Sequence, residues 1–498
     1  MNLSLLILVP LVTAVAVLFC KDHKQVRSVS FAGSAIQLVI AFIFLSQFYA
    51  ERKAGNTSTM LFQSVYKWFP ALNIEFATGV DGISLAMIML TAFVVLAGVL
   101  VSWKITDLNK EFFFLLLMLS AGAYGFFISL DLFTLFFFLE IAVIPKFLLI
   151  GIWGSGQKNY SAMKLALMLM GGSALVLVGI LGMYYSSDVN GAHSFSLMAL
   201  AEHPIALEKQ MLFFPLAFTG FGIFTALFPF HTWVPDGHSS APTAGSMFLA
   251  GISMKLGGYG CLRVATFLMP QAAHYYSPYI IVLATIAILY GAFATMMQKD
   301  LKYINAYSSV SHCGFVLLGI GMLNRISIEG AVMQMVSHGL MTALFFAVIG
   351  MLYDRTHTRM LSQLGGLLKV MPFICAVFVI AGLCSLGLPG FSGFVAEMTV
   401  FMGSWQNPGT LYRVATILAT ASIVVTAVYI LRAVGSTVMG PLNHDYYKSL
   451  KDAEWNEKLA AGLLIVAIVA IGFAPFLLQN LIGAGTDNLM KNISAILK

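Results

Sequence analysis

The sequence predicts an all-α polytopic membrane protein with about 14 transmembrane helices. Of its 498 residues, 59% are apolar and only 10% are Asp, Glu, Lys or Arg. Soluble globular chains carry about 25% charged residues, so a chain with a mean hydropathy of +0.89 cannot cover a water-facing surface. One bilayer crossing takes about 20 apolar residues, and this length accommodates about fourteen crossings with their connections.

Apolar runs of spanning length follow one another along the whole chain. We interpret the first as a retained helix rather than a signal peptide, because its positive charges follow the apolar run and no small-residue cleavage site precedes them. No Arg-rich transit segment is evident, so the expected location is a bacterial cytoplasmic (inner) membrane. The predicted spans cover residues 3–20, 28–48, 80–102, 112–129, 131–153, 164–186, 211–228, 246–267, 276–297, 302–322, 331–353, 372–403, 410–435 and 456–478.

The basic residues predict an orientation for these spans. Alternate loops collect 16 of the 27 Lys and Arg residues on one side and 8 on the other. By the positive-inside rule the larger group is cytoplasmic, and both termini face outward. The larger group is Lys21, Lys24, Arg27, Lys104, Lys110, Lys158, Lys164, Lys299, Lys302, Arg355, Arg359, Lys369, Arg432, Lys448, Lys451 and Lys458. The net charge of +6 suits contact with anionic headgroups, and no basic stretch with interleaved aromatic residues indicates a nucleic-acid partner.

Proline interrupts two of the predicted spans, the seventh and the twelfth. Pro229 lies in FTALFPFHTWVPDGHSSAPTAGS, and Pro389 lies in SLGLPGFSGF. Proline removes a backbone donor and frees backbone polar groups at membrane depth, which is tolerated beside a cavity. The two positions are five helices apart, an odd offset that inverts one unit relative to the other. Paired interruptions of this kind indicate an inverted-repeat transporter.

A few ionisable residues lie deep within the predicted spans. A charge at midplane costs several kcal/mol unless it is paired or hydrated, so a functional role is the default interpretation. Lys255 is about nine residues, or roughly 13 Å, into its span and cannot easily reach water. Glu140 and Glu397 are equally deep. Such groups can exchange protons near neutral pH; the alternative for each is a structural ion pair.

Histidines and one arginine complete this set. His312 and His338 lie in apolar helices and could relay protons through their two nitrogens, or each could be satisfied by a hydrogen bond. His231 and His238, in the Pro-rich link, either line an entrance or serve packing and capping. Arg263 is near the end of its helix, where we expect its side chain to reach the headgroups.

Other chemistry has no support in the sequence. The five cysteines show no CxxC spacing, so no disulfide framework, zinc site or iron–sulfur cluster is expected. Phosphate-binding glycine motifs, metal-ligand clusters and Ser, His and Asp arrangements are also not evident. We therefore expect no cofactor and no redox centre in this chain.

Several long motifs resemble a known family. FPFHTWVPDGHSSAPTAGSMFLAGISMKLGGYGCLR, DLKYINAYSSVSHCGF, SHGLMTALFF and LGLPGFSGFVAE resemble the antiporter-like subunits of proton-pumping NADH:quinone oxidoreductase, respiratory complex I. The chain is most similar to the subunit M branch, the counterpart of mitochondrial subunit four. Two features favour that branch: Glu397 stands where the related subunits have lysine, and the chain ends soon after helix fourteen without a long lateral helix.

The resemblance implies an architecture and a route for protons. It implies N-terminal helices 1–3 in residues 1–110, inverted repeats of five helices in residues 111–270 and 271–436, and a C-terminal loop with helix 14 in residues 437–498. The implied proton-transfer residues are Glu140 of helix 5, Lys255 of helix 8, the linking His312 and His338, and the terminal acid Glu397. The implied partners are other membrane-arm subunits, including the related antiporter-like ones, and subunits that use NADH, FMN, iron–sulfur clusters and quinone.

One position departs from the family pattern. The family carries a lysine in helix 7, followed two positions later by proline, where this chain has Phe224 and Ala226. Lys146, in LEIAVIPKFLLIG, stands where the pattern has an apolar residue. Our hypothesis is that Lys146 replaces the missing lysine as partner of Glu140; the alternative is that it reaches the headgroups.

Two further functions are compatible with these motifs. One is a subunit of a multi-subunit cation/proton antiporter, which shares the helices but works without a redox arm. The other is a non-conducting structural subunit, which the missing helix-7 lysine favours.

Overall fold

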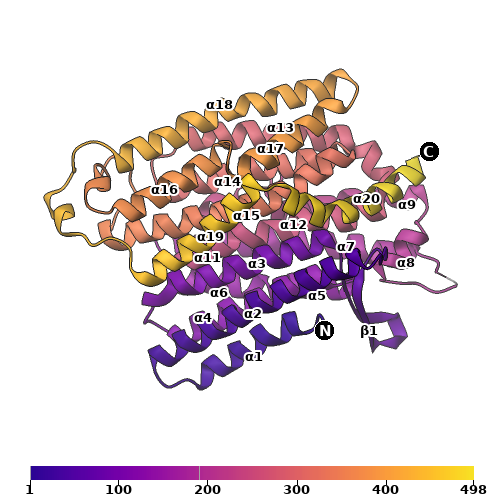
Figure 1. The fold of residues 1–498 in the computed structure, drawn as a ribbon. Helices are drawn as coiled ribbons and strands as arrows, with labels where there is room; N and C mark the ends of the chain where they lie inside the picture. The colour runs from indigo at the N-terminus through magenta and orange to yellow at the C-terminus, as the bar shows by residue number, and fades with distance from the viewer. Residues whose placement is uncertain (1, 190, 498) are drawn as a thin grey trace.

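Long helices run side by side between two ends of the molecule (Figure 1). The computed structural model describes residues 2–189 and 191–497, with 495–497 described by backbone alone. Within these residues, nine helices are long and apolar enough to cross a membrane, and two shorter apolar helices accompany them, Leu5–Phe19 and Pro372–Ser385. The chain is therefore the mostly helical, multi-pass membrane protein that its composition predicts.

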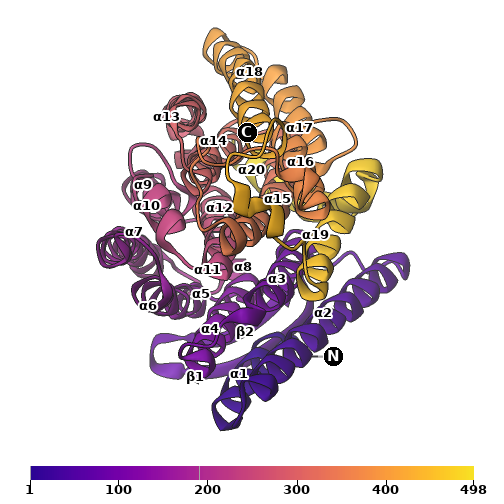
Figure 2. The same ribbon diagram turned by 90° about the vertical axis from the view of Figure 1, so that its left-hand side faces the viewer.

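The N-terminal helices form one side of the bundle (Figure 2). Helix α1 packs against α2 and α4, and α2 packs against α3. These elements are α1 (Leu5–Phe19), α2 (His23–Lys53), α3 (Gly82–Val101), the 3-10 turn η2 (Ser102–Lys104) and α4 (Asn109–Ile128).

The next helices include the first interruption. Helix α9 ends at Thr225 and α10 begins at Trp233, so the break predicted around Pro229 is present. A further break, consistent with a kink at Pro145, divides the predicted span 131–153 at Ala142, within the turn that precedes this proline. The elements are α5 (Leu132–Ile141), α6 (Val143–Trp153), α7 (Lys158–Ser186), α8 (Leu197–Glu202), α9 (Leu207–Thr225), α10 (Trp233–Ser240), α11 (Thr243–Phe248), the π-helix η3 (Leu249–Ser253), α12 (Met254–Gly260) and the π-helix η4 (Cys261–Thr266).

The remaining helices surround a long central one. Helix α15 lies at the middle of the end-on view (Figure 2), and its most apolar stretch is entirely buried. The predicted interruption at Pro389 separates α16 from α17. The elements are α13 (Pro270–Met297), α14 (Leu301–Gly321), α15 (Arg325–Thr356), η5 (Leu367–Lys369), α16 (Pro372–Ser385), α17 (Ser392–Gln406), α18 (Thr410–Val438), η6 (Asp445–Ser449), α19 (Trp455–Phe473) and α20 (Phe476–Leu497).

A two-stranded hairpin precedes α3, in a segment that the sequence analysis left as a connection. Antiparallel strands β1 (Leu61–Phe69) and β2 (Ile74–Val80) are joined by the 3-10 turn η1 (Pro70–Leu72). Asp131 ties this hairpin to the bundle, because it accepts backbone hydrogen bonds from Glu75 and from Phe133 and Thr134 at the start of α5. Burial raises the pKa of Asp131 to about 6, although these hydrogen bonds act in the opposite direction.

Helix α20 follows the last predicted span and was also missed. It packs against α3, α13 and α15, and Leu481, Ile482, Leu489 and Ile493 are buried. The spacing of these residues, one and then seven and four apart, places them on one helical face. The expectation that the chain simply ends after helix fourteen is therefore incomplete.

Arg263 does not reach the headgroups, so that prediction was wrong. Its guanidinium is buried and forms an ion pair with Asp81, the residue that caps α3 through the backbone N–H of Ser84. The Arg263 side chain also lies over the rings of Tyr259 and Phe267. Arg263 is in the π-helix η4, and its ion pair with Asp81 directs the side chain toward the start of α3 rather than to water.

The connections between helices gather at two opposite ends. At one end, which we call the basic end, Lys104 pairs with Glu454, Arg359 pairs with Asp300, and Trp153 donates to the Asp107 carbonyl. At the other, the hairpin end, Thr78 bridges to Ser129, Asp131 bridges to Ser196, and Asn324 bonds Asn407. The loops predicted to be cytoplasmic therefore share one end.

The Arg263–Asp81 pair predicts a non-additive effect on stability. Arg263→Met leaves a buried carboxylate without its partner and should lower stability by about 3–5 kcal/mol. Adding Asp81→Asn removes that charge and keeps an acceptor for Ser84, so the double variant should recover most of the loss. Thermal unfolding in detergent measures both, and equal destabilisation of the two variants would contradict the assignment.

Candidate functional site

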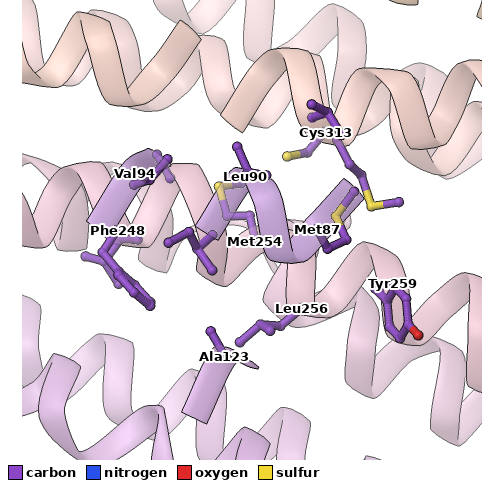
Figure 3. Close-up of a cluster of buried hydrophobic side chains, with 14 of the residues drawn as sticks. Met87, Leu90, Val94, Ala123, Phe248, Met254, Leu256, Tyr259 and Cys313 are labelled. Atoms are coloured by element: carbon purple, nitrogen blue, oxygen red, sulfur yellow. The ribbon is translucent and has the colours of Figure 1, made fainter. Parts of the chain in front are cut away.

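Lys255 lies in a short α-helix between two π-helices. The π-helices η3 and η4 flank α12, which carries it, and such π-helical turns interrupt helices mainly at functional sites. Figure 3 shows a cluster of buried apolar side chains to which α12 contributes, with residues from α3, α4, α11, α12 and α14: Met87, Leu90, Val94, Ala123, Phe248, Met254, Leu256, Tyr259 and Cys313. The lysine is buried, as its position in the span predicts.

The Lys255 side chain has two polar contacts. Its Nζ donates to the Ala250 carbonyl and lies 2.7 Å from Nδ1 of His338 on α15. An ammonium donates to the neutral imidazole here, and a neutral amine would accept from a protonated one. Two basic groups can therefore share one proton across this contact.

His338 and His312 continue the polar contacts toward α14. Their ring centroids are 5.4 Å apart at an interplanar angle of 34°. His338 Nε2 has no hydrogen-bond partner among the described residues. On the far side, Nδ1 of His312 lies 3.2 Å from Oε1 of Glu397, and Nε2 lies 3.3 Å from the Ser385 hydroxyl. Four of the six predicted residues therefore form one buried row: Lys255, His338, His312 and Glu397.

The helix break at Pro389, between α16 and α17, brings the backbone close to the acidic end of this row. Gly387 adopts a left-handed φ of +74°, and a Cβ there would lie 2.6 Å from Oε2 of Glu397. Glycine thus lets the interrupted backbone approach the carboxylate closely. Beside it, the hydroxyls of Ser392 and Ser337 lie 2.8 Å apart and join α17 to α15.

The row also includes side chains that the sequence analysis did not select. Gln334 Nε2 lies 3.4 Å from Nδ1 of His312, and Cys313 Sγ lies 3.8 Å from Nδ1 of His338. Gln334 precedes His338 by one helical turn on α15, so the spacing of four residues was the available signal.

Glu140 and Lys146 are not part of the row. Lys146 is only 1% exposed, its Nζ has no hydrogen-bond partner among the described residues, and it lies 5.8 Å from the Phe224 ring centroid. The alternative in which Lys146 reaches the headgroups is therefore wrong. Glu140 is partly buried, and its Oε1 also has no partner in the described part of the chain.

The histidines of the first break pack against aromatic rings. His231 stacks on Phe228 beside Tyr290, and His238 stacks on Phe346. Both histidines are buried. The packing role is thus present for both, and neither lines the cavity described next.

A polar cavity of about 520 Å³ opens at the basic end. Lys104, Thr243, Lys302, Asp354 and His357 are among its lining residues. Lys302, which the sequence placed in a cytoplasmic loop, is buried and donates to the Ala241 carbonyl at the end of α10. The cavity is large enough for several water molecules.

Comparisons with known proteins agree with this architecture. Residues 129–426 match the family model described as NADH:quinone oxidoreductase/Mrp antiporter, TM. Chain 4 of the NAD(P)H-quinone oxidoreductase of Gloeobacter violaceus is 36% identical over 494 residues, which cover 98% of this chain and 92% of that one.

Solved structures show the same fold. A chain of respiratory complex I from Thermus thermophilus with bound NADH has a TM-score of 0.89 and 25% identity, over 99% of both chains. A chain of the Mrp complex from Dietzia sp. has a TM-score of 0.84 and 20% identity, over 100% of this chain and 99% of that one. The last likeness concerns the fold alone.

The contact between Lys255 and His338 depends on a close approach of α15 to η3. We therefore expect a side chain at the glycine between them, Gly339, to disturb this contact. A Cβ at Gly339 would lie 2.7 Å from the Gly251 carbonyl oxygen. Gly339→Ala should force the two helices apart, lower stability by about 1–3 kcal/mol and lengthen the Lys255–His338 distance. Thermal unfolding and a cryo-EM structure of the variant measure these effects.

Gly171 on α7 provides the matched control, because a Cβ there meets nothing within 4 Å. Gly171→Ala should leave stability unchanged or raise it by about 0.5–1 kcal/mol. If both substitutions had the same effect, the close approach would not hold the pair together.

Proposed function

The chain belongs to the NADH:quinone oxidoreductase/Mrp antiporter transmembrane family, and from this premise we propose that it is a proton-translocating membrane-arm subunit of an NADH:quinone oxidoreductase. The observation that carries the proposal is the buried row of Lys255, His338, His312 and Glu397. Every member can gain or lose a proton. Burying four such groups in a membrane is energetically unfavourable, so a functional role is the default interpretation.

The row supports transfer in steps. A proton on Lys255 passes to His338 over 2.7 Å, and a proton on His312 passes to Glu397 over 3.2 Å. The middle step, from His338 to His312, has no direct hydrogen bond and requires a water molecule or a ring rotation. After these three transfer steps Lys255 is a neutral amine and Glu397 is a neutral acid. One proton has moved along the row, and the number of protons in it is unchanged.

The basic end supplies the direction. With its Lys and Arg residues facing the cytoplasm, the cavity beside Lys302 and Asp354 opens toward the side from which protons are taken. Glu397 is the last member of the row and lies next to the interrupted backbone of α17, where protons leave outward. Both termini then face the outer side of a bacterial inner membrane.

The architecture behind this route is fourteen crossings, of which ten form two inverted units of five. We count α5 with α6 as one crossing, and likewise α11 to η4, and α16 with α17. The first unit is residues 111–270 and the second is residues 271–436, preceded by 1–110 and followed by 437–498. Support comes from the breaks, which fall between α9 and α10 in the first unit and between α16 and α17 in the second.

Partner subunits supply the driving force. Moving one charge against the membrane potential costs about 2.3 kcal/mol per 100 mV, and the row itself releases no redox energy. NADH, FMN, iron–sulfur clusters and quinone belong to other subunits of the enzyme, while the neighbours in the membrane arm are the related antiporter-like subunits. The chain is thus part of an oxidoreductase without a redox centre of its own.

Substitutions in the row test this function. Lys255→Met and Glu397→Gln remove a titratable group at each end, and NADH-driven proton uptake per assembled complex should fall at least about tenfold. The measurement uses the purified complex in proteoliposomes with a pH-sensitive dye and quinone as acceptor. Lys448→Met, at an exposed loop lysine, is the control and should pump normally.

Two outcomes would overturn the proposal. Normal pumping by both assembled variants would indicate a non-conducting structural subunit. Sodium-dependent proton flux in the absence of NADH, abolished by Lys255→Met, would indicate the cation/proton antiporter instead.

A further inference from the structure

Two buried charged atoms without partners lie on either side of the break at Ala142. Glu140 is in the last turn of α5, and Lys146 is in the first turn of α6. Among the described residues, neither Oε1 of Glu140 nor Nζ of Lys146 has a hydrogen-bond partner. A structural ion pair would place these atoms in contact, and they form none. Another reason is needed for burying the Lys146 ammonium beside the partly buried Glu140.

The burial of Lys146 is too costly to be incidental. Taking an ammonium out of water costs several kcal/mol even after relaxation, and its flexible stem normally lets the ammonium reach the headgroups. Here Nζ instead points inward to Phe224. An aromatic face attracts a desolvated cation by about 2 kcal/mol, which offsets only part of that cost.

The position of Phe224 supplies a second attraction. Phe224 lies in the last turn of α9, immediately before the first helix break. Carbonyl groups at a helix C-terminus carry a partial negative charge that stabilises a nearby cation. Lys146 thus places its charge at the point where α9 is interrupted.

Glu140 provides the remaining negative charge. In a continuous helix, residues six apart are separated by about 9 Å of rise and roughly 240° of rotation, which puts them on different faces. The break at Ala142, with Pro145 in the following turn, replaces that geometry. The two side chains then lie on neighbouring turns on either side of the break, where their opposite charges attract across a medium of low effective dielectric.

We propose that Lys146 is a positioning residue for proton transfer in the first half of the chain. Its ammonium, held over Phe224 at the break of α9, compensates the charge of the Glu140 carboxylate while that group waits for a proton. When Glu140 is protonated, the positive charge of Lys146 no longer has a negative partner. The protonation state of Glu140 is therefore coupled to that of Lys146. This inference rests on the proposed function and extends it to residues outside the row.

Moving the ammonium tests the inference directly. Lys146→Met should lower NADH-driven pumping per assembled complex at least tenfold. Lys146→Met combined with Phe224→Lys returns an ammonium to the same space from α9, and pumping should recover to at least half of the wild-type rate. Lys146→Met with Phe224→Leu is the matched control and should not recover.

The outcomes separate this inference from the function on which it rests. Normal pumping by Lys146→Met, while Lys255→Met does not pump, overturns the role of Lys146 and leaves the proposed function intact. Normal pumping by Lys255→Met overturns the proposed function itself. If Lys146→Met fails to assemble, the variant with Phe224→Lys decides: restored assembly with restored pumping supports the inference, and any other result overturns it.

Discussion

The contact between Lys255 and His338 is the interaction on which the rest of the arrangement depends. The surrounding lipid offers no hydrogen-bond partner at this depth, so a buried lysine needs one inside the protein. The partner is on α15, the central and most deeply buried helix, and it is reached because Gly339 and Gly251 let α15 and η3 approach closely. The π-helices on both sides of α12 then set the direction of the lysine within an otherwise apolar core. An apolar helix bundle would not require a buried lysine, nor the two π-helices that flank it.

Interrupting a helix in a membrane frees carbonyl groups, and the junction between α10 and α11, which follows the first break, shows how the chain satisfies them. Ser246 donates to the His238 carbonyl, Lys302 donates to that of Ala241, and Arg359 donates to that of Ser239. All three carbonyls lie near the end of α10, at the basic end. Basic side chains that the sequence assigns to loops are therefore also structural donors, which explains why Lys302 is buried beside the cavity.

The sequence predicted individual helices and deep charges well, and contacts between distant segments poorly. Scarcity of charge in the spans was enough to select Lys255, Glu397 and Lys146, because a buried charge is unfavourable wherever it occurs. The same rule failed for Arg263, whose partner Asp81 is 182 residues away. The break at Ala142 falls where Pro145 predicts a kink, because proline cannot donate to the carbonyl four residues before it, that of Ile141. By contrast, the apolar face of α20 could not be assigned to the core from sequence alone, because α3 and α15, which bury it, are distant in the chain.

The buried row and the Glu140–Lys146 pair are surrounded by different kinds of contact. In the row, which joins Lys255 of the first unit to His338, His312 and Glu397 of the second, each member has a titratable neighbour within hydrogen-bond or ring-contact distance, so a proton can be passed on. Earlier in the chain, the buried Nζ of Lys146 and the buried Oε1 of the partly buried Glu140 form no hydrogen bond among the described residues, and Lys146 lies instead against the Phe224 ring near the end of α9. At low effective dielectric, charges that do not touch still interact appreciably. Glu140 and Lys146 can therefore respond to each other's charge without a continuous chain of hydrogen bonds, whereas the row needs its contacts for proton transfer itself.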